Sequence, residues 1–378
     1  MVTLNFDVIP LSLHATLFPQ PEASVEELLT FKPPSQDRNS SSAHPSIYFS
    51  NNTAVAISVD TIQQLRSLSI PSQPTLDALF HYLANSMTVL PTSVSYAHLS
   101  IDHLLRHVSF PLWVIMYWLR ISRLWRHAVV PWMRAEQWLS SSLSSLGNRD
   151  FVAEARSILR DLPWTGKTWA FTDSEPISTF AQYLSSGWLA STHIHQQLDL
   201  LRHQLIQDLP IYEFDLLPSQ FFTKLISVYK HHQHDYADTQ QFREMWTRGE
   251  ELAKPEFQRM RIGGVVNTNG NHWVGFVVDL HSSSILYGDS LAMTDDVIVL
   301  ALSWWTHIHT KLHFVRLPLP IGIQTDGVSC GLFATSALKH HFLPDCELIG
   351  QRGVITERLR LFCETARYEV NTVSLQLD

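Results

Sequence analysis

The stretch that decides the fold is QTDGVSCG, residues Gln324–Gly331, in which a cysteine precedes a glycine and an apolar run, Leu332–Leu338. That run is compatible with a helix, and the loop before it contains prolines and glycines, which would place Cys330 in the first helical turn. The partial positive charge at a helix N-terminus lowers the pKa of a thiol and so favours the reactive thiolate. The stretch therefore predicts a nucleophilic cysteine at the start of a helix.

A histidine and an aspartate that would complete such a site lie in GNHWVGFVVDLHSSSILYGDSL, residues 270–291. The apolar run Val274–Leu280, a polar turn and the short apolar run Ile285–Tyr287 predict two adjacent strands. These strands would bring His272 and Asp289 to the same end of a sheet. An imidazole can hold a thiol as thiolate, and a carboxylate can orient that imidazole.

An oxyanion donor is also available. Gln324 lies six residues before Cys330, and its side-chain amide could donate a hydrogen bond to an oxyanion, together with backbone N–H groups beside the nucleophile. Asp279 is a rival to Asp289, but it lies only seven residues after His272 and before the turn. We therefore interpret Asp279 as structural.

Together these residues resemble the C-terminal catalytic domain of the ubiquitin-like-protein proteases, the Ulp-type SUMO proteases, which are related to the adenovirus protease. The family's histidine–tryptophan pair, Tyr-x-Asp-Ser strand end and Gln-x5-Cys-Gly element match His272–Trp273, Tyr287–Ser290 and Gln324–Gly331. Weaker matches begin at Gly187 and Asp215, so the resemblance extends from about Pro163 to the C-terminus. It implies an α+β, papain-like fold, with the nucleophile helix packed on a mixed or antiparallel sheet.

The resemblance also implies a function and a set of roles. It implies a cysteine-type peptidase that cleaves after the C-terminal Gly-Gly of SUMO or another ubiquitin-like modifier and uses no cofactor or metal. Trp188 and Trp273 would clamp the extended Gly-Gly tail of that partner. The catalytic roles fall on Cys330 as nucleophile, His272 as base, Asp289 as orienter and Gln324 as oxyanion donor.

Two positions depart from the family pattern. Ser329 stands where most cellular members have aspartate, and Asp326 stands where most have asparagine. Two other functions therefore stay open. The domain could be a catalytically weak module that binds a ubiquitin-like modifier, or a mobile-element-associated protease that processes its own proteins.

Composition narrows the function classes further. The formal net charge of −8 argues against a dedicated nucleic-acid surface. Three cysteines without CxxC spacing predict no disulfide framework and a reducing compartment, nuclear or cytoplasmic. The N-terminus lacks the basic region of a secretory signal. The most apolar stretch, Phe110–Leu119, is shorter than the about 20 residues that a membrane span needs, so no membrane association is expected.

The remaining candidates are given structural interpretations. Cys346 and Cys363 are interpreted as structural thiols. The histidines of KHHQHD, residues 230–235, have no matched ligand set elsewhere, so we interpret them as a polar helix end or loop.

The chain is expected to have three parts: an irregular segment with a Pro- and Ser-rich linker at 1–46, an α-helical domain of unknown role at 47–160, and the catalytic domain at 161–378. Helices are expected from Asp60 to about Leu146, with Thr75 and Ser100 as N-caps. An apolar stripe at helical spacing is formed by Trp118, Ile121, Trp125 and Ala128.

Overall fold

The computed structural model describes residues 9–35, 45–50, 59–85, 93–99, 105–142, 146–210, 213–293 and 296–377. The chain divides into two compact units: Met1–Arg134 with Leu159–Thr165, and Ala135–Ile158 with Gly166–Asp378. None of the helices in the described ranges is both long enough and apolar enough to cross a membrane.

The first unit combines helices with a small sheet. Its helices are α1 (His14–Leu17), α2 (Val25–Thr30), α3 (Val59–Ser67), α4 (Gln73–Asn85), α5 (Trp113–Leu124) and a π-helical segment, Trp125–Val129. This segment continues into α6 (Val130–Ser142), of which only the residues up to Arg134 belong to the first unit. Its antiparallel sheet has the order β1 (Phe49–Ser50), β2 (Ser93–Leu99) and β3 (Leu105–Phe110). Of the predicted stripe, Trp118, Ile121 and Ala128 are buried, whereas Trp125 is only half-buried.

Helices precede residue 161 as expected, but the prediction that the secondary structure from Asp60 to about Leu146 is entirely helical was wrong. Residues 93–99 and 105–110 are paired strands, and Val94 lies opposite Phe110 with both side chains buried. Their sequences alternate polar and apolar residues in places, which is a strand period. Thr75 lies inside the first turn of α4 rather than at its N-cap. Ser100 and most of the predicted linker lie outside the described residues.

The second unit is built on one mixed, five-stranded sheet. Its order is β4 (Phe214–Leu216), β5 (Arg261–Thr268), β6 (His272–Asp279), β7 (Ser284–Gly288) and β8 (Val315–Pro318). The two outer pairs are parallel and the two inner pairs are antiparallel. Its helices are α7 (Arg149–Asp161), which belongs to this unit up to Ile158, α8 (Ser191–Asp208), α9 (Ser219–His231), α10 (Arg243–Leu252), α11 (Val297–Thr310), α12 (Cys330–Phe342) and α13 (Val354–Leu377).

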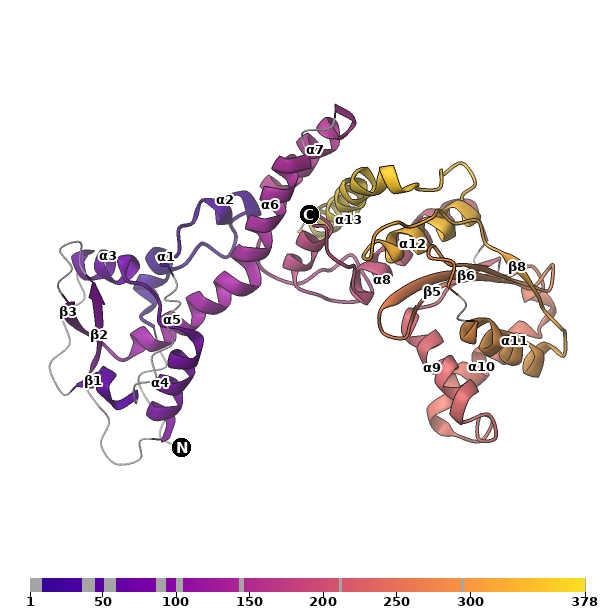
Figure 1. The fold of residues 1–378 in the computed structure, drawn as a ribbon, viewed down its shortest axis with the longest axis horizontal. Helices are drawn as coiled ribbons and strands as arrows, with labels where there is room; N and C mark the ends of the chain where they lie inside the picture. The colour runs from indigo at the N-terminus through magenta and orange to yellow at the C-terminus, as the bar shows by residue number, and fades with distance from the viewer. Residues whose placement is uncertain are drawn as a thin grey trace. The chain divides into compact units, whose positions relative to one another are not determined.

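Helices cover both faces of this sheet (Figure 1). On one face, α9, α10 and α11 form an apolar core with Val274, Phe276 and Val278 of β6. On the other face α12 packs so closely that a Cβ added at Gly275 would lie 3.1 Å from the carbonyl oxygen of Ala334. The helix that begins with Cys330 therefore packs directly against the strand that begins with His272.

The sequence did not indicate β4, β5 or α10. Two adjacent glycines interrupt the apolar pattern of β5, and glycine disfavours strands on propensity alone. Packing requires a small residue here, because a Cβ at Gly264 would lie 2.4 Å from the Phe222 ring. The need for glycine comes from a helix more than thirty residues away in sequence, which local pattern cannot show.

Candidate active site

The hairpin between β5 and β6 positions the histidine. Asn269 and Gly270 both have positive φ, 55° and 78°, a conformation that glycine and asparagine tolerate best. This short connection pairs Thr268 with His272, so His272 is the first residue of β6. Asp289 directly follows the antiparallel strand β7, and both side chains lie at the same end of the sheet, as predicted.

His272 and Asp289 form a buried ion pair. The His272 Nε2 atom lies 2.7 Å from Asp289 Oδ1, and their side chains are only 6% and 4% exposed. The backbone N–H groups of Leu291 and Met293 donate to Asp289 Oδ1 and Oδ2 at 2.8 and 3.0 Å, which fixes the carboxylate. The carboxylate in turn fixes the imidazole and leaves Nδ1 as the ring nitrogen for another partner.

That partner is Cys330. Burial by itself would raise the pKa of the Cys330 thiol, but hydrogen bonds from His272, from the Trp188 indole and from the Trp273 backbone hold this pKa below its usual value. For His272 the effect of burial is the opposite, because it lowers the pKa of the imidazole. Hydrogen bonds and charges of Asp289 and Cys330 outweigh burial and raise the pKa of His272 to about 9. The pKa of Asp289 is lowered, against the effect of its burial, chiefly by the hydrogen bond with His272. The lowered pKa of Cys330 and the raised pKa of His272 favour a thiolate–imidazolium pair.

The two tryptophans lie beside the cysteine and use their indole N–H groups differently. The ring centroids of Trp188 and Trp273 are 6.3 Å apart, with the ring planes tilted by 46°. Trp188 Nε1 donates to Cys330 Sγ at 3.1 Å, whereas Trp273 Nε1 donates to the Leu189 carbonyl at 3.1 Å. Trp273 is buried and Trp188 is half-buried, so Trp188 keeps part of its ring accessible.

Gln324 is held by its own loop. Its side-chain nitrogen donates to the backbone oxygen of Asp326 at 2.7 Å and lies 3.2 Å from Asp326 Oδ1. Its side-chain oxygen accepts from Ser290 Oγ at 2.9 Å. In this arrangement the Gln324 amide points its N–H groups at Asp326, one of the two positions that depart from the family pattern.

Asp326 organises the loop before the nucleophile. Its Oδ1 accepts from the backbone N–H groups of Val328 and Ser329, and its Oδ2 accepts from Ser329 Oγ and Gln351 Nε2. Burial would raise the pKa of this carboxyl, but those donors hold it at about 2. Asp326 and Ser329, the two residues that depart from the family pattern, are therefore hydrogen-bonded to each other. Together they shape the turn that precedes Cys330.

The segment of the chain that holds this site matches a known protein family. Residues 187–348 match the Ulp1 protease family, C-terminal catalytic domain. This segment, which is less than half of the chain, is therefore similar to the catalytic domain of that cysteine protease family. The matched segment contains the six predicted site residues, although the match does not by itself assign their roles.

Solved structures resemble this chain at low sequence identity. The C-terminal Ulp1 protease domain in complex with Smt3, the yeast ortholog of SUMO, is 18% identical, with a TM-score of 0.43 over 58% of this chain and 96% of that chain. The Xanthomonas campestris effector XopD bound to ubiquitin is 20% identical, with a TM-score of 0.33 over 47% and 91%. The Chaetomium thermophilum Ulp1-like SUMO protease catalytic domain is 14% identical, with a TM-score of 0.39 over 55% and 78%. No curated protein matches the chain.

The other two thiols of the second unit differ from Cys330. Cys363 is buried in α13, where burial and the nearby Glu154 raise its pKa to about 12. It contacts the Phe151 carbonyl oxygen, with its sulfur 3.7 Å away. Cys346 is partly exposed, and its carbonyl oxygen accepts from His340. Of the two buried cysteines, only Cys330 has a lowered pKa.

A Ser–His–Asp arrangement, separate from Cys330, His272 and Asp289, lies in the same unit. His195 Nδ1 is 2.6 Å from Asp173 Oδ2, and His195 Nε2 is 2.9 Å from Ser219 Oγ. The backbone N–H of Ser219 also donates to Nε2, and Ser219 is only 4% exposed at the start of α9. The histidine therefore joins α8 to the first turn of α9, and we assign this arrangement a structural role.

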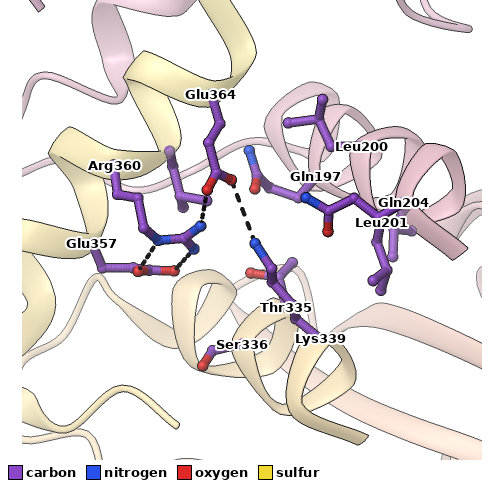
Figure 2. Close-up of a pocket in the computed structure, with 12 residues that line it drawn as sticks. Gln197, Leu200, Leu201, Gln204, Thr335, Ser336, Lys339, Glu357, Arg360 and Glu364 are labelled. Atoms are coloured by element: carbon purple, nitrogen blue, oxygen red, sulfur yellow. Dashed lines mark hydrogen bonds and ion pairs between the residues drawn. The ribbon is translucent and has the colours of Figure 1, made fainter. Parts of the chain in front are cut away.

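A charged network joins α12 to α13 around a small cavity of about 20 Å³, which has room for roughly one water molecule (Figure 2). Arg360 bonds Glu357 and Glu364, and Lys339 bonds Glu364 at 3.5 Å. Each of these four charged groups has a partner of opposite sign. The network therefore supports the helix that carries Cys330 and offers no unpaired charge to a ligand.

Proposed function

We propose that this domain cleaves the bond after the C-terminal Gly-Gly of SUMO or another ubiquitin-like modifier, with Cys330 as nucleophile. One observation carries the proposal. His272 Nε2 lies 2.7 Å from Asp289 Oδ1, and the same imidazole is hydrogen-bonded to Cys330, the first residue of α12. This is the order of orienter, base and nucleophile that thiol catalysis needs.

The proposed reaction has two halves. The Cys330 thiolate attacks the glycine carbonyl carbon, a C–S bond forms, and the electron pair of the C=O bond moves to oxygen. Collapse of this intermediate breaks the C–N bond, and the His272 imidazolium donates its proton to the leaving amine. Neutral His272 then takes a proton from the water that attacks the thioester. Collapse releases the glycine carboxylate and restores the thiolate–imidazolium pair.

Backbone donors at the start of α12 would stabilise the oxyanion. The first N–H groups of a helix have no partner within that helix, and the positive end of the helix dipole also lies there. One oxyanion donor is typically worth about 3 kcal/mol of transition-state stabilisation. Gln324 would contribute its amide only after exchanging a hydrogen bond with Asp326.

The proposed partner is recognised by the absence of side chains in its tail. Trp188 and Trp273 lie beside the Cys330 sulfur, with ring centroids 6.3 Å apart, and aromatic surfaces at this spacing favour a narrow, extended glycine segment. Three free cysteines without a disulfide framework suit a reducing compartment, so we propose that the protein acts in the nucleus or cytoplasm.

Activity-based probes test this proposal. The full chain would be treated with vinyl sulfones of SUMO, of ubiquitin and of other ubiquitin-like modifiers, and the modified peptide would be located by mass spectrometry. We expect one probe to form an adduct at Cys330, no adduct for Cys330→Ser, and an unchanged adduct for Cys346→Ser. Absence of an adduct at Cys330 with every modifier would overturn the proposal.

The same preparation separates the two alternatives. Tight binding of a modifier without turnover of its conjugates would favour a module that only binds. Cleavage of a neighbouring element-encoded protein, unaffected by added modifier, would favour a protease that processes proteins of its own element.

A further inference from the structure

The Trp188 side chain does more than present a ring beside the nucleophile. Its indole N–H donates to Cys330 Sγ at 3.1 Å, and this sulfur belongs to a residue that is only 1% exposed. An indole has a single N–H donor and no acceptor. The hydrogen bond of that N–H group therefore fixes how the Trp188 ring is oriented. In this conformation that donor is directed at the reacting atom.

The backbone that carries Trp188 is held at three consecutive carbonyl groups. Gly187 O accepts from Arg358 Nη2 at 2.5 Å, Trp188 O accepts from Gln182 Nε2 at 2.9 Å, and Leu189 O accepts from Trp273 Nε1 at 3.1 Å. The three donors come from α13, from the turn before Trp188 and from β6. Bonds from three separate elements fix the segment and therefore pre-organise the indole donor.

Close packing on both sides supports this placement. A Cβ added at Gly187 would lie 2.5 Å from Gln182 Nε2, and one added at Gly331 would lie 2.9 Å from Ile194 and 3.3 Å from the Trp273 ring. Glycine at position 187 leaves room for the Gln182 side chain that bonds the Trp188 carbonyl, and glycine at position 331 lets the start of α12 lie against Ile194 and Trp273. Close packing therefore constrains both the segment that carries Trp188 and the helix turn that carries Cys330.

The side-chain amide expected to act as donor is occupied elsewhere. The Gln324 nitrogen is engaged by two oxygens of Asp326, at 2.7 and 3.2 Å. The Cys330 sulfur instead accepts hydrogen bonds from His272, from the Trp273 backbone and from the Trp188 indole. Among these three donors, only the Trp188 N–H comes from outside the His272–Trp273 strand end.

We propose that the Trp188 indole N–H is a catalytic donor that stabilises the Cys330 thiolate in the free enzyme. The N–H group donates to the charged sulfur before attack and releases it as the C–S bond forms and the charge moves to the carbonyl oxygen. This role depends on the hydrogen of the indole and not on ring area, so it is separate from clamping a glycine tail. It deepens the proposed function, yet it concerns a property of the thiol that exists without any protein substrate.

The test measures the pH dependence of Cys330 alkylation by iodoacetamide in the full chain, followed by mass spectrometry of the Cys330 peptide. Trp188→Phe removes the N–H and keeps an aromatic ring. We expect its alkylation midpoint to rise by roughly one pH unit, which corresponds to about 1.4 kcal/mol. Trp169→Phe is the matched control, because Trp169 is 70% exposed in the same unit, and its midpoint should equal that of the wild type.

A second variant keeps the proposal falsifiable if phenylalanine disturbs the segment. Replacing Trp188 by β-(3-benzothienyl)alanine exchanges only the N–H for sulfur and preserves the bicyclic shape. The same rise in midpoint is expected, and an unchanged midpoint in this variant would overturn the proposal. A higher alkylation rate at the high-pH plateau with an unchanged midpoint would mean that Trp188 only covers the sulfur. Because no modifier is used, either result is independent of which substrate the enzyme cleaves.

Discussion

Replacing Asp289 by asparagine tests the central arrangement most directly. Asp289 Oδ1 accepts from His272 Nε2 and Leu291 N, and Oδ2 accepts from Met293 N. Asparagine has a single oxygen, so its NH2 group must face one of these backbone donors. The variant therefore loses a charge next to His272 and also loses part of the hydrogen bonding that orients the side chain.

The size of the effect follows from the pKa of His272. This pKa rises from 6.5 to about 9, and the difference of about 2.5 corresponds to roughly 3.4 kcal/mol. Cys330 provides part of the rise, so we assign about 2 kcal/mol to Asp289, which is roughly a 30-fold effect. A misoriented imidazole adds roughly another tenfold, and kcat/KM should fall about 10²- to 10³-fold.

The assay combines hydrolysis of a modifier carrying a C-terminal fluorogenic amide with iodoacetamide alkylation of Cys330. Asp279→Asn is a matched control, because Asp279 also accepts two backbone N–H groups, from His281 and Ser282, at the far end of β6. Asp279→Asn should retain activity, whereas Asp289→Asn should lose activity and shift the alkylation midpoint upward. Activity of Asp289→Asn within threefold of wild type, in a protein that melts normally, would refute the assignment of Asp289 as orienter.

Three further outcomes are expected. Cleavage should decline above pH 9 in a pH–rate profile, because the pKa of His272 is about 9 and its imidazolium is lost there. The ion pair of His272 with Asp289 also stabilises the fold: this contribution is complete below pH 6.5 and disappears as the pH rises through about 9. Gly264→Ala should lower the free energy of unfolding by about 2 kcal/mol in denaturant titrations, because its Cβ would lie 2.4 Å from the Phe222 ring, whereas Gly350→Ala, with no atom within 4 Å, should change it little. Asp326→Asn should lower the free energy of unfolding at pH 7 by about 1–2 kcal/mol in the same titration, because it removes one of two oxygens that together accept five hydrogen bonds.

Much of this domain could be predicted from local sequence. The apolar runs after His272 and before Asp289 predicted two adjacent strands, and the structure places both residues at the same end of β6 and β7. The apolar run after Cys330 predicted a helix, and α12 begins at that residue. These predictions hold because strand ends, turns and helix starts depend on residues that are close in sequence.

Other features could not be predicted in this way. The strand β5 contains two glycines that its packing requires, and the small sheet of the first unit was predicted as helix. Gln324 was expected to face an oxyanion, whereas its amide is held by Asp326. In each case the deciding neighbour is a side chain or strand whose position depends on packing.

The sequence by itself determined the chemistry that is possible: a cysteine before a helix, and a histidine and an aspartate at strand ends. It also placed two tryptophans among the candidates, through the family they resemble. Only the tertiary structure decided which donors reach the sulfur. The indole of Trp188 meets Cys330 across 142 residues of chain, because three carbonyl groups around it are bonded by separate elements. Contacts of this range depend on how helices and strands pack, and no local pattern records them.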